Sequence, residues 1–317
     1  MLLVYAIKRL LLSMAITVLA IVALFAMIYV VPGDPAKVAL GPRASPAVVA
    51  AFRERMGLDL PLYKQLGRYF SQIAAGDLGT DVISARSVTA IVAQEMPHTL
   101  ALIAASMLWS ILLGLPLGCH AALHRGSISD SILGALSVAT ITVPPFVVAI
   151  FSLIVFSVWL GWFPVIGAGE PGDILDQAWH LVLPAFALGL GWVGYVARLV
   201  RASLLEVLSE THIRLARAFG LPRAMILTQY ALRIAVLPLI TVLGIGIGGL
   251  LTGAVFAEIV FTRPGIGKLV YDAIITRNYP VVTGTILVTT VFYILVNLVT
   301  DLISAGLDPR VRQNLAN

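Results

Sequence analysis

Residues 197–238 read ARLVRASLLEVLSETHIRLARAFGLPRAMILTQYALRIAVLP, a polar stretch between two apolar segments. Two glutamates, Glu206 and Glu210, stand against six arginines: Arg198, Arg201, Arg214, Arg217, Arg223 and Arg233. Gly220 is typical of a helix end and Pro222 of a helix start, so the sequence predicts one helix over 204–219 and another from Pro222. Apolar residues between the charges favour a short helix that inserts into a groove on a soluble partner over a merely solvated loop.

The rest of the chain is strongly apolar. Of its 317 residues, 59% are hydrophobic and 12% are charged, whereas soluble domains carry about 25% charged residues. Apolar runs of about twenty residues without alternation predict membrane-spanning helices, so the predicted fold class is an all-α polytopic membrane protein. Nucleic-acid binding is a poor interpretation of the net charge of +5, because no soluble basic domain is present. The single cysteine, Cys119, cannot form an internal disulfide.

The sequence predicts six spans, with the first one uncleaved and both termini on one side. The spans cover 10–31, 99–121, 133–160, 179–197, 234–256 and 281–304, and Pro144-Pro145 should kink or break the third. The chain then divides into an N-terminal transmembrane helix (1–31), an outer helical loop (32–98), a core (99–305) with a loop at 198–233, and a tail (306–317). Within the outer loop, helices are expected at 46–56 and 62–75.

The distribution of charge orients these spans. With the N-terminus inside, 11 of the 21 basic residues and five of the 16 acids lie in the cytoplasm, which gives net charges of +6 inside and −1 outside. Cytoplasmic loops carry an excess of lysine and arginine. The polar stretch at 197–238 is therefore predicted to be cytoplasmic.

Two glycine patterns resemble nucleotide-binding motifs but lack their context. The GxGxxG match at 244–249 lies inside an apolar span with no preceding strand. The Gly265-Ile266-Gly267-Lys268 segment resembles the end of a phosphate loop, yet Leu269 and Thr262 stand where that motif needs Ser or Thr and Gly. The sequence therefore predicts no nucleotide site in this chain.

Other glycines are spaced for close helix approach. GxxxG pairs occur at Gly244/Gly248, Gly249/Gly253 and Gly114/Gly118. Packing within the chain, a subunit interface and a pore-lining face all remain open as interpretations. Ionisable residues are nearly absent from the span centres, with Glu258 and Asp301 at span borders, which argues against an ion-coupled carrier and against a membrane-embedded enzyme.

The segment Ile213-Arg-Leu-Ala-Arg-Ala-Phe-Gly220, followed by Leu232-Arg-Ile-Ala-Val-Leu-Pro238, resembles the EAA loop of inner-membrane permeases of binding-protein-dependent ABC importers. Arg214, Leu215 and Ala216 replace the usual Glu-Ala-Ala, and the spacing from Gly to Pro is longer by five residues. Both departures are similar to the dipeptide/oligopeptide/nickel branch. Further matches in order are VPGDP at 31–35, GLDLP at 57–61, GDLGT at 76–80, LGWFP at 160–164, FTRPGIG at 261–267, YP at 279–280 and DPRVR at 308–312.

The resemblance implies a type I ABC importer permease in the bacterial inner membrane, with both termini cytoplasmic and no catalytic residues. It implies a second paralogous permease, two ATPase subunits, a periplasmic binding protein and membrane lipid as partners. This chain would bind no metal or cofactor, and ATP and Mg would be held by the ATPases. The residues expected to couple to the ATPases are Arg214, Leu215, Ala216, Arg217, Ala218, Phe219, Gly220 and Leu221, and those expected on the translocation path are Pro144, Pro145, Gly244 and Gly248.

The resemblance leaves the cargo open. Di- and oligopeptides are expected first, and nickel, opines, glutathione and oligosaccharides are alternatives within the same family. A carrier or channel that works without an ATPase is the alternative from another class. The outer loop (32–98) and the segment 257–280 are expected to contact the binding protein.

Overall fold

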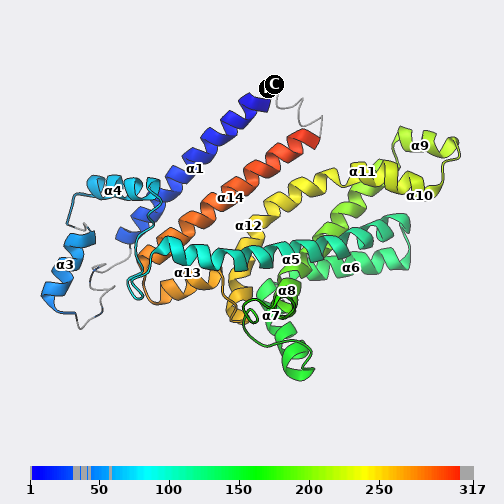
Figure 1. Ribbon diagram of the computed structural model, residues 1–317. Helices are drawn as coiled ribbons and strands as arrows, with labels where there is room; N and C mark the ends of the chain where they lie inside the picture. The colour runs from blue at the N-terminus through cyan, green and yellow to red at the C-terminus, as the bar shows by residue number, and fades with distance from the viewer. Residues whose placement is uncertain (1, 31–35, 37–40, 42–43, 57–58, 308–317) are drawn as a thin grey trace.

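The computed structural model shows an elongated bundle of helices (Figure 1). It describes residues 2–30, 36, 41, 44–56 and 59–307, and no β-strand occurs among them. The VPGDP match at 31–35 and nearly all of the tail predicted at 306–317 lie outside the described residues. The prediction of an all-α membrane protein is confirmed.

Among the residues that the structure describes, four helices are long and apolar enough to cross a membrane. They are α5 (Val88–Leu123), α8 (Ile174–Leu208), α12 (Leu237–Val260) and α14 (Tyr279–Leu307). A fifth span would come from α6 (Ile128–Thr142) together with α7 (Pro145–Ser152) and the π-helix η1 (Leu153–Trp159). The apolar part of α1 (Leu2–Val30) that the structure describes is shorter, Leu10–Ala26. The protein is therefore multi-pass, while the count of six spans stays a prediction.

The third predicted span is broken where the sequence placed the break. The segments before and after Pro144-Pro145 meet at 98°. Pro144 has φ −60° and ψ 141°, an extended conformation, and Pro145 is the first residue of α7. Neither proline can donate a backbone hydrogen bond to the preceding turn, so α6 ends at Thr142 and the chain restarts in a new direction.

The core of the bundle is the close pair of α5 and α8. A Cβ placed on Gly114 would lie 2.7 Å from the Cβ of Val196, and one on Gly118 would lie 2.6 Å from the carbonyl oxygen of Ala197. This pair of glycines thus serves packing within the chain. At 35 residues, α8 is about 52 Å long, well beyond the roughly 30 Å of a hydrocarbon core, so one end projects past the membrane.

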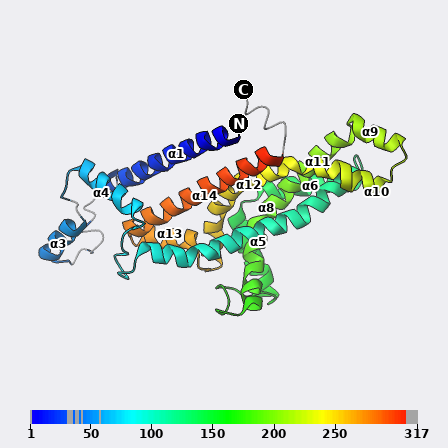
Figure 2. The ribbon, with the colours of Figure 1, turned by 45° about the horizontal axis from the view of Figure 1, so that its top comes forward.

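Residues 46–74 add two short helices at one end of the bundle (Figure 2). Helices α3 (Pro46–Met56) and α4 (Leu62–Ala74) fall within one residue of the predicted bounds. The inner face of α4 packs on α1 and α14 through Tyr69, Phe70 and Ile73. At the same end, α13 (Ile266–Ile275) lies between α12 and α14.

At the opposite end, the predicted single helix over 204–219 is wrong. Helix α8 continues to Leu208, and α9 begins anew at Thr211 after an extended Glu210 with ψ 154°. Leu204 and Ile213 are nine residues apart, so a continuous helix would place them about 180° from each other. The break allows both side chains to enter the same buried cluster.

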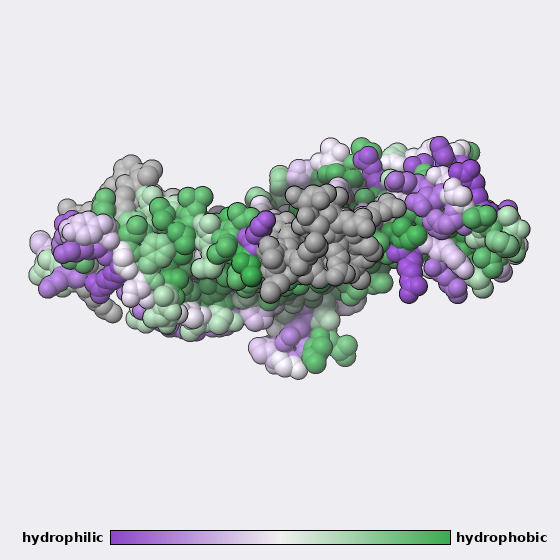
Figure 3. All heavy atoms as spheres, turned by 90° about the horizontal axis from the view of Figure 1, so that it is seen from above, coloured by the Kyte–Doolittle hydropathy of each residue, from purple (hydrophilic) through white to green (hydrophobic). Residues whose placement is uncertain are grey.

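Polar residues gather at the two ends of the molecule. On the face drawn in Figure 3, hydrophilic side chains concentrate over the end that carries α3 and α4 and over the end that carries α9, with hydrophobic side chains between them. Apolar side chains along the middle are widely exposed, for example Leu112 at 59% and Leu136 at 55%. Such a belt suits surrounding lipid.

Candidate functional site

The predicted coupling residues lie in a helical hairpin that projects from the end of α8. It consists of α9 (Thr211–Ala218), α10 (Arg223–Met225), the π-helix η2 (Ile226–Ala231) and α11 (Leu232–Ala235). A buried apolar cluster joins it to α8 and α5: Ala122, Leu204, Val207, Ile213, Ala216, Ile226, Ala231 and Ala235. The hairpin is therefore fixed to the bundle by its own core.

The end of α9 is a Schellman motif. The N–H of Gly220 donates to the carbonyl of Arg217 (3.0 Å), and the N–H of Leu221 donates to the carbonyl of Ala216 (3.2 Å). Gly220 has φ +75°, the left-handed conformation that glycine adopts without a Cβ penalty. A Cβ at Gly220 would meet no atom within 4 Å, so backbone conformation and not space selects glycine there.

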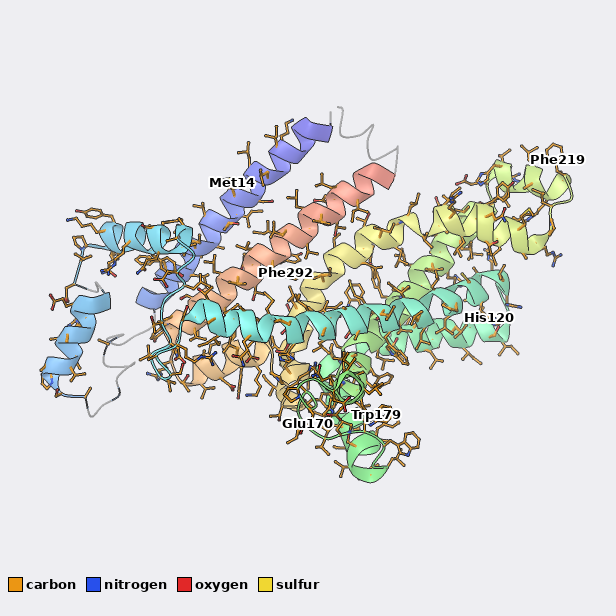
Figure 4. All side chains as sticks on the ribbon, viewed as in Figure 1. Met14, His120, Glu170, Trp179, Phe219 and Phe292 are labelled. Atoms are coloured by element: carbon orange, nitrogen blue, oxygen red, sulfur yellow. The ribbon has the colours of Figure 1, made fainter. Side chains whose placement is uncertain are left out.

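The tip of the hairpin carries an exposed aromatic residue. Phe219 is 83% exposed and Leu215 is 54% exposed, while Arg214, Arg217 and Ala218 are also open to solvent. Figure 4 shows Phe219 at the far end of the loop between α9 and α10, away from the bundle. A large apolar side chain so exposed on a rigid helix end, beside two cations, is suited to insertion into a partner's pocket.

Two predicted coupling residues pack against the core of the hairpin. Ala216 is 6% exposed and packs in the cluster that roots the hairpin, and Leu221 is half-buried against the same cluster. The small side chain of Ala216 therefore lets α9 approach η2 and α8 within this chain. The outward-facing members of the predicted set are Arg214, Leu215, Arg217, Ala218, Phe219 and Gly220.

A second polar site lies at the C-terminal end of α12, around Glu258. The sequence analysis noted Glu258 only as an acid at a span border. Glu258 is fully buried, and its carboxylate accepts hydrogen bonds from the Thr99 hydroxyl (2.5 Å), the Gly267 N–H (2.8 Å) and the Lys268 N–H (3.0 Å). The Thr99 oxygen in turn accepts the Ile266 N–H at 2.8 Å. These bonds tie α12, α5 and the first turn of α13 together.

This contact explains the segment that resembles a phosphate loop. The amides of Gly267 and Lys268 do donate to an acceptor, but the acceptor is the carboxyl oxygen Oε2 of Glu258. A Cβ on Gly265 would lie 2.2 Å from a Glu258 oxygen, so the glycine makes room for that carboxylate. An acid at the end of an apolar span, followed by Pro-Gly and a new helix, was the signal available in the sequence.

The structure separates the four residues predicted on the translocation path. Pro144 and Pro145 form the bend before α7, and Pro145 lies near Gly253 of α12. Gly244 and Gly248 instead face α14, where an added Cβ would lie 2.1 Å from Thr300 and 2.6 Å from Tyr293. A cavity of about 510 Å³ borders Gly248 between α12, α13 and α14. Whether any of the four lines a path stays a prediction.

Comparison with known families identifies the chain. The family model of the binding-protein-dependent transport system inner membrane component matches residues 114–313, and its N-terminal companion matches residues 2–103. The chain belongs to this family. As such a component, it is the permease subunit of an ABC importer, and the earlier resemblance is confirmed.

Known relatives of this permease cover nearly its whole length. The glutathione transport system permease protein GsiC of Escherichia coli (strain K12) is 37% identical over 308 residues, 97% of this chain and 98% of that protein. The protein of the same name from Salmonella paratyphi A is 36% identical over the same share. A permease structure from the inward-facing MetNI methionine ABC transporter matches with a TM-score of 0.56 at 20% identity, covering 69% of this chain and 96% of that one. The type I importer permease fold is thus confirmed.

Proposed function

We propose that the hairpin at 211–235 is the cytoplasmic docking element through which ATPase subunits drive this permease. Membership in an ABC importer family implies ATPases and a binding protein as partners. Two ATPases would bind ATP with Mg, and a second permease would complete the path. Rigid-body movement of the two permeases would then alternate between inward and outward openings. The ATPase chemistry would belong to the partners, with this chain supplying the surface that receives the movement.

The observation that carries this proposal is the exposure of Phe219 on a rigid support. Its side chain is 83% exposed, yet the α9 beneath it is held by a Schellman motif and a buried cluster. A preorganised helix end loses little conformational freedom on binding, so an apolar anchor there gives affinity efficiently. Arg214 and Arg217 flank the anchor and suit acidic groups on an ATPase.

Phe219→Ser in the intact complex tests the docking role. Truncating a central aromatic anchor typically costs about 2 kcal/mol or more, roughly thirtyfold in affinity. We therefore expect loss of ATPase subunits during purification of the complex and loss of ATP hydrolysis stimulated by the binding protein. Tyr63→Ser is the matched control for retention of the ATPase subunits, because Tyr63 is an aromatic residue 72% exposed at the opposite end.

Two results would reject the docking role. One is a Phe219→Ser complex that keeps its ATPases and its stimulated hydrolysis. The other is cargo transport by this chain alone in proteoliposomes, which would establish the alternative of a carrier or channel.

For the cargo, we propose a small peptide. The relatives at 36–37% identity are named as glutathione transport permeases, and glutathione is a tripeptide. Their names and the di- and oligopeptides expected from the sequence therefore point to the same chemical class. Nickel, opines and oligosaccharides remain the alternative cargoes within the family. The placement of the outer helices and of the α12–α13 turn at one end supports their proposed contact with the binding protein.

Uptake measurements with the reconstituted complex and its binding protein test the cargo. We expect labelled glutathione or a di- or tripeptide to be imported on ATP addition, with each competing against the other. Import of Ni²⁺ or of an oligosaccharide that unlabelled peptides do not inhibit would overturn the peptide assignment and leave the docking role standing.

A further inference from the structure

A bidentate ion pair joins α6 to α8 near the end that carries the hairpin. The Arg201 Nε donates to Asp130 Oδ1 at 2.6 Å, and the Arg201 Nη2 donates to Asp130 Oδ2 at 2.7 Å. The side chain of Asp130 is 8% exposed and that of Arg201 is 34% exposed. Paired, short and shielded hydrogen bonds of this kind fix orientation as well as distance.

The carboxylate is also held from its own side. The N–H of Gly126 donates to Asp130 Oδ2 at 3.0 Å, and the N–H of Asp130 donates to the Ser127 hydroxyl at 3.2 Å. The first bond fixes the side chain to the turn between α5 and α6. The second caps the first turn of α6 through the Asp130 backbone. Because the Asp130 carboxylate is held in place, its ion pair with Arg201 fixes the position of α8 relative to α6.

The link connects the proposed docking hairpin with the Pro144-Pro145 bend. Arg201 lies seven residues before the end of α8 at Leu208, and the cluster around Leu204 and Ile213 holds α9 to α8. In the other direction, α6 runs from Asp130 to the 98° bend after Thr142. On one side, the ion pair is connected to the hairpin through the last turns of α8. On the other side, it is connected to the bend through α6.

A second contact along α6 and α8 makes the two helices a single unit. A Cβ on Gly194 would lie 2.6 Å from the carbonyl oxygen of Ser137, and one on Gly191 would lie 3.2 Å from that of Thr140. The helices thus touch closely in the middle, and the ion pair holds them at one end. With both attachments in place, α6 cannot slide or rotate against α8 without breaking the bidentate contact.

We propose that Asp130 and Arg201 are a positioning pair that makes α6 follow α8 when the ATPases move the hairpin, so that the movement reaches the Pro144-Pro145 bend. The proposal rests on the proposed function, because the hairpin must be the element that is moved. The pair touches neither ATPase nor cargo. Its role is to convert a displacement of the hairpin into a displacement of α6.

Variants of the pair in the complete complex, with its ATPases and binding protein in nanodiscs or proteoliposomes, test the role. We expect Arg201→Gln and Asp130→Asn to retain the ATPase subunits while the cargo imported per ATP hydrolysed falls by about fivefold or more. Arg201→Lys keeps the charge but loses the bidentate fork, so it should give an intermediate ratio. Arg198→Gln, an exposed arginine almost one turn earlier on α8, is the matched control and should keep the wild-type ratio.

The outcomes separate this proposal from a purely structural role and from the docking role. An unchanged cargo-to-ATP ratio in both Arg201→Gln and Asp130→Asn would overturn it. So would a fall in transport and hydrolysis in proportion to the amount of folded complex, because that pattern indicates stability alone. Failure of the docking role gives a different result, because the Phe219→Ser complex would then keep its ATPases. That result does not depend on the cargo-to-ATP ratio measured for the Arg201 and Asp130 variants.

Discussion

The α12–α13 turn and the α9–α10 turn use the same residue types in opposite ways. Each contains a phenylalanine, an arginine, a proline and a glycine within a few positions. In the α12–α13 turn, Phe261 is 2% exposed and Arg263 is 3% exposed, beside the fully buried Glu258. In the α9–α10 turn, Phe219 is 83% exposed, and its neighbouring arginines face solvent.

The difference separates a turn whose side chains pack against this chain from a turn whose side chains are left uncovered. The first turn satisfies the carboxylate of Glu258 with donors from this chain, so it acts as an internal clasp between helices. The second turn satisfies only its backbone internally and leaves an aromatic anchor uncovered. A change in the clasp should therefore act on folding, whereas a change at the anchor should act on assembly.

The largest effect on stability is expected from Glu258→Leu. The change leaves the buried N–H groups of Gly267 and Lys268 without an acceptor, at about 1–3 kcal/mol each, so the loss should reach about 3 kcal/mol or more. Thermal unfolding of the purified chain in detergent measures it. Glu206→Leu, at an exposed site on α8, is the control and should stay within about 0.5 kcal/mol. Equal stability of the two variants would contradict the clasp.

A smaller effect is expected from Gly220→Ala. The left-handed backbone at φ +75° costs a residue with a Cβ about 1–2 kcal/mol, and the surrounding space adds no clash. The cost should appear as local fraying of α9, measured by hydrogen exchange of the amides of Phe219 to Leu221. Gly134→Ala, at an uncrowded glycine inside α6, should cause no comparable loss. Unchanged exchange at α9 would show that the Schellman motif does not hold the tip.

The smallest effect is a pH dependence at the clasp end. Burial opposes ionisation of Asp81, but hydrogen bonds from Ser84, Ile83 and Asn278 outweigh it, so the pKa of Asp81 lies below its ordinary value. A pKa lowered by folding contributes stability above the unfolded value of about 3.9, and this contribution is lost as the pH falls through the folded pKa.

The comparison of wild type with Asp81→Asn isolates that contribution. We expect the wild type to unfold at the higher temperature at pH 7, and the difference between the two to shrink as the pH is lowered below about 4. A difference that stays constant from pH 7 to pH 3 would mean that the charge of Asp81 has no part in joining the 77–87 loop to Asn278.

The sequence by itself determined the features that depend on local chemistry. Apolar runs of span length predicted the membrane helices, Pro144-Pro145 predicted the break, and Gly220 predicted the end of the short helix, because lipid solvation and backbone dihedrals act within a few residues. The family followed from short motifs in order along the chain. The same local signals set the bounds of α3 and α4 to within one residue.

Only the tertiary structure decided which polar and small residues face which neighbours. It divided the predicted helix at 209–210 so that Leu204 and Ile213 could share one core, and it turned Ala216 inward. It also paired Glu258 with Thr99 and Asp130 with Arg201, partners that are 159 and 71 positions apart. Contacts over such separations depend on the arrangement of whole helices, which no local pattern contains.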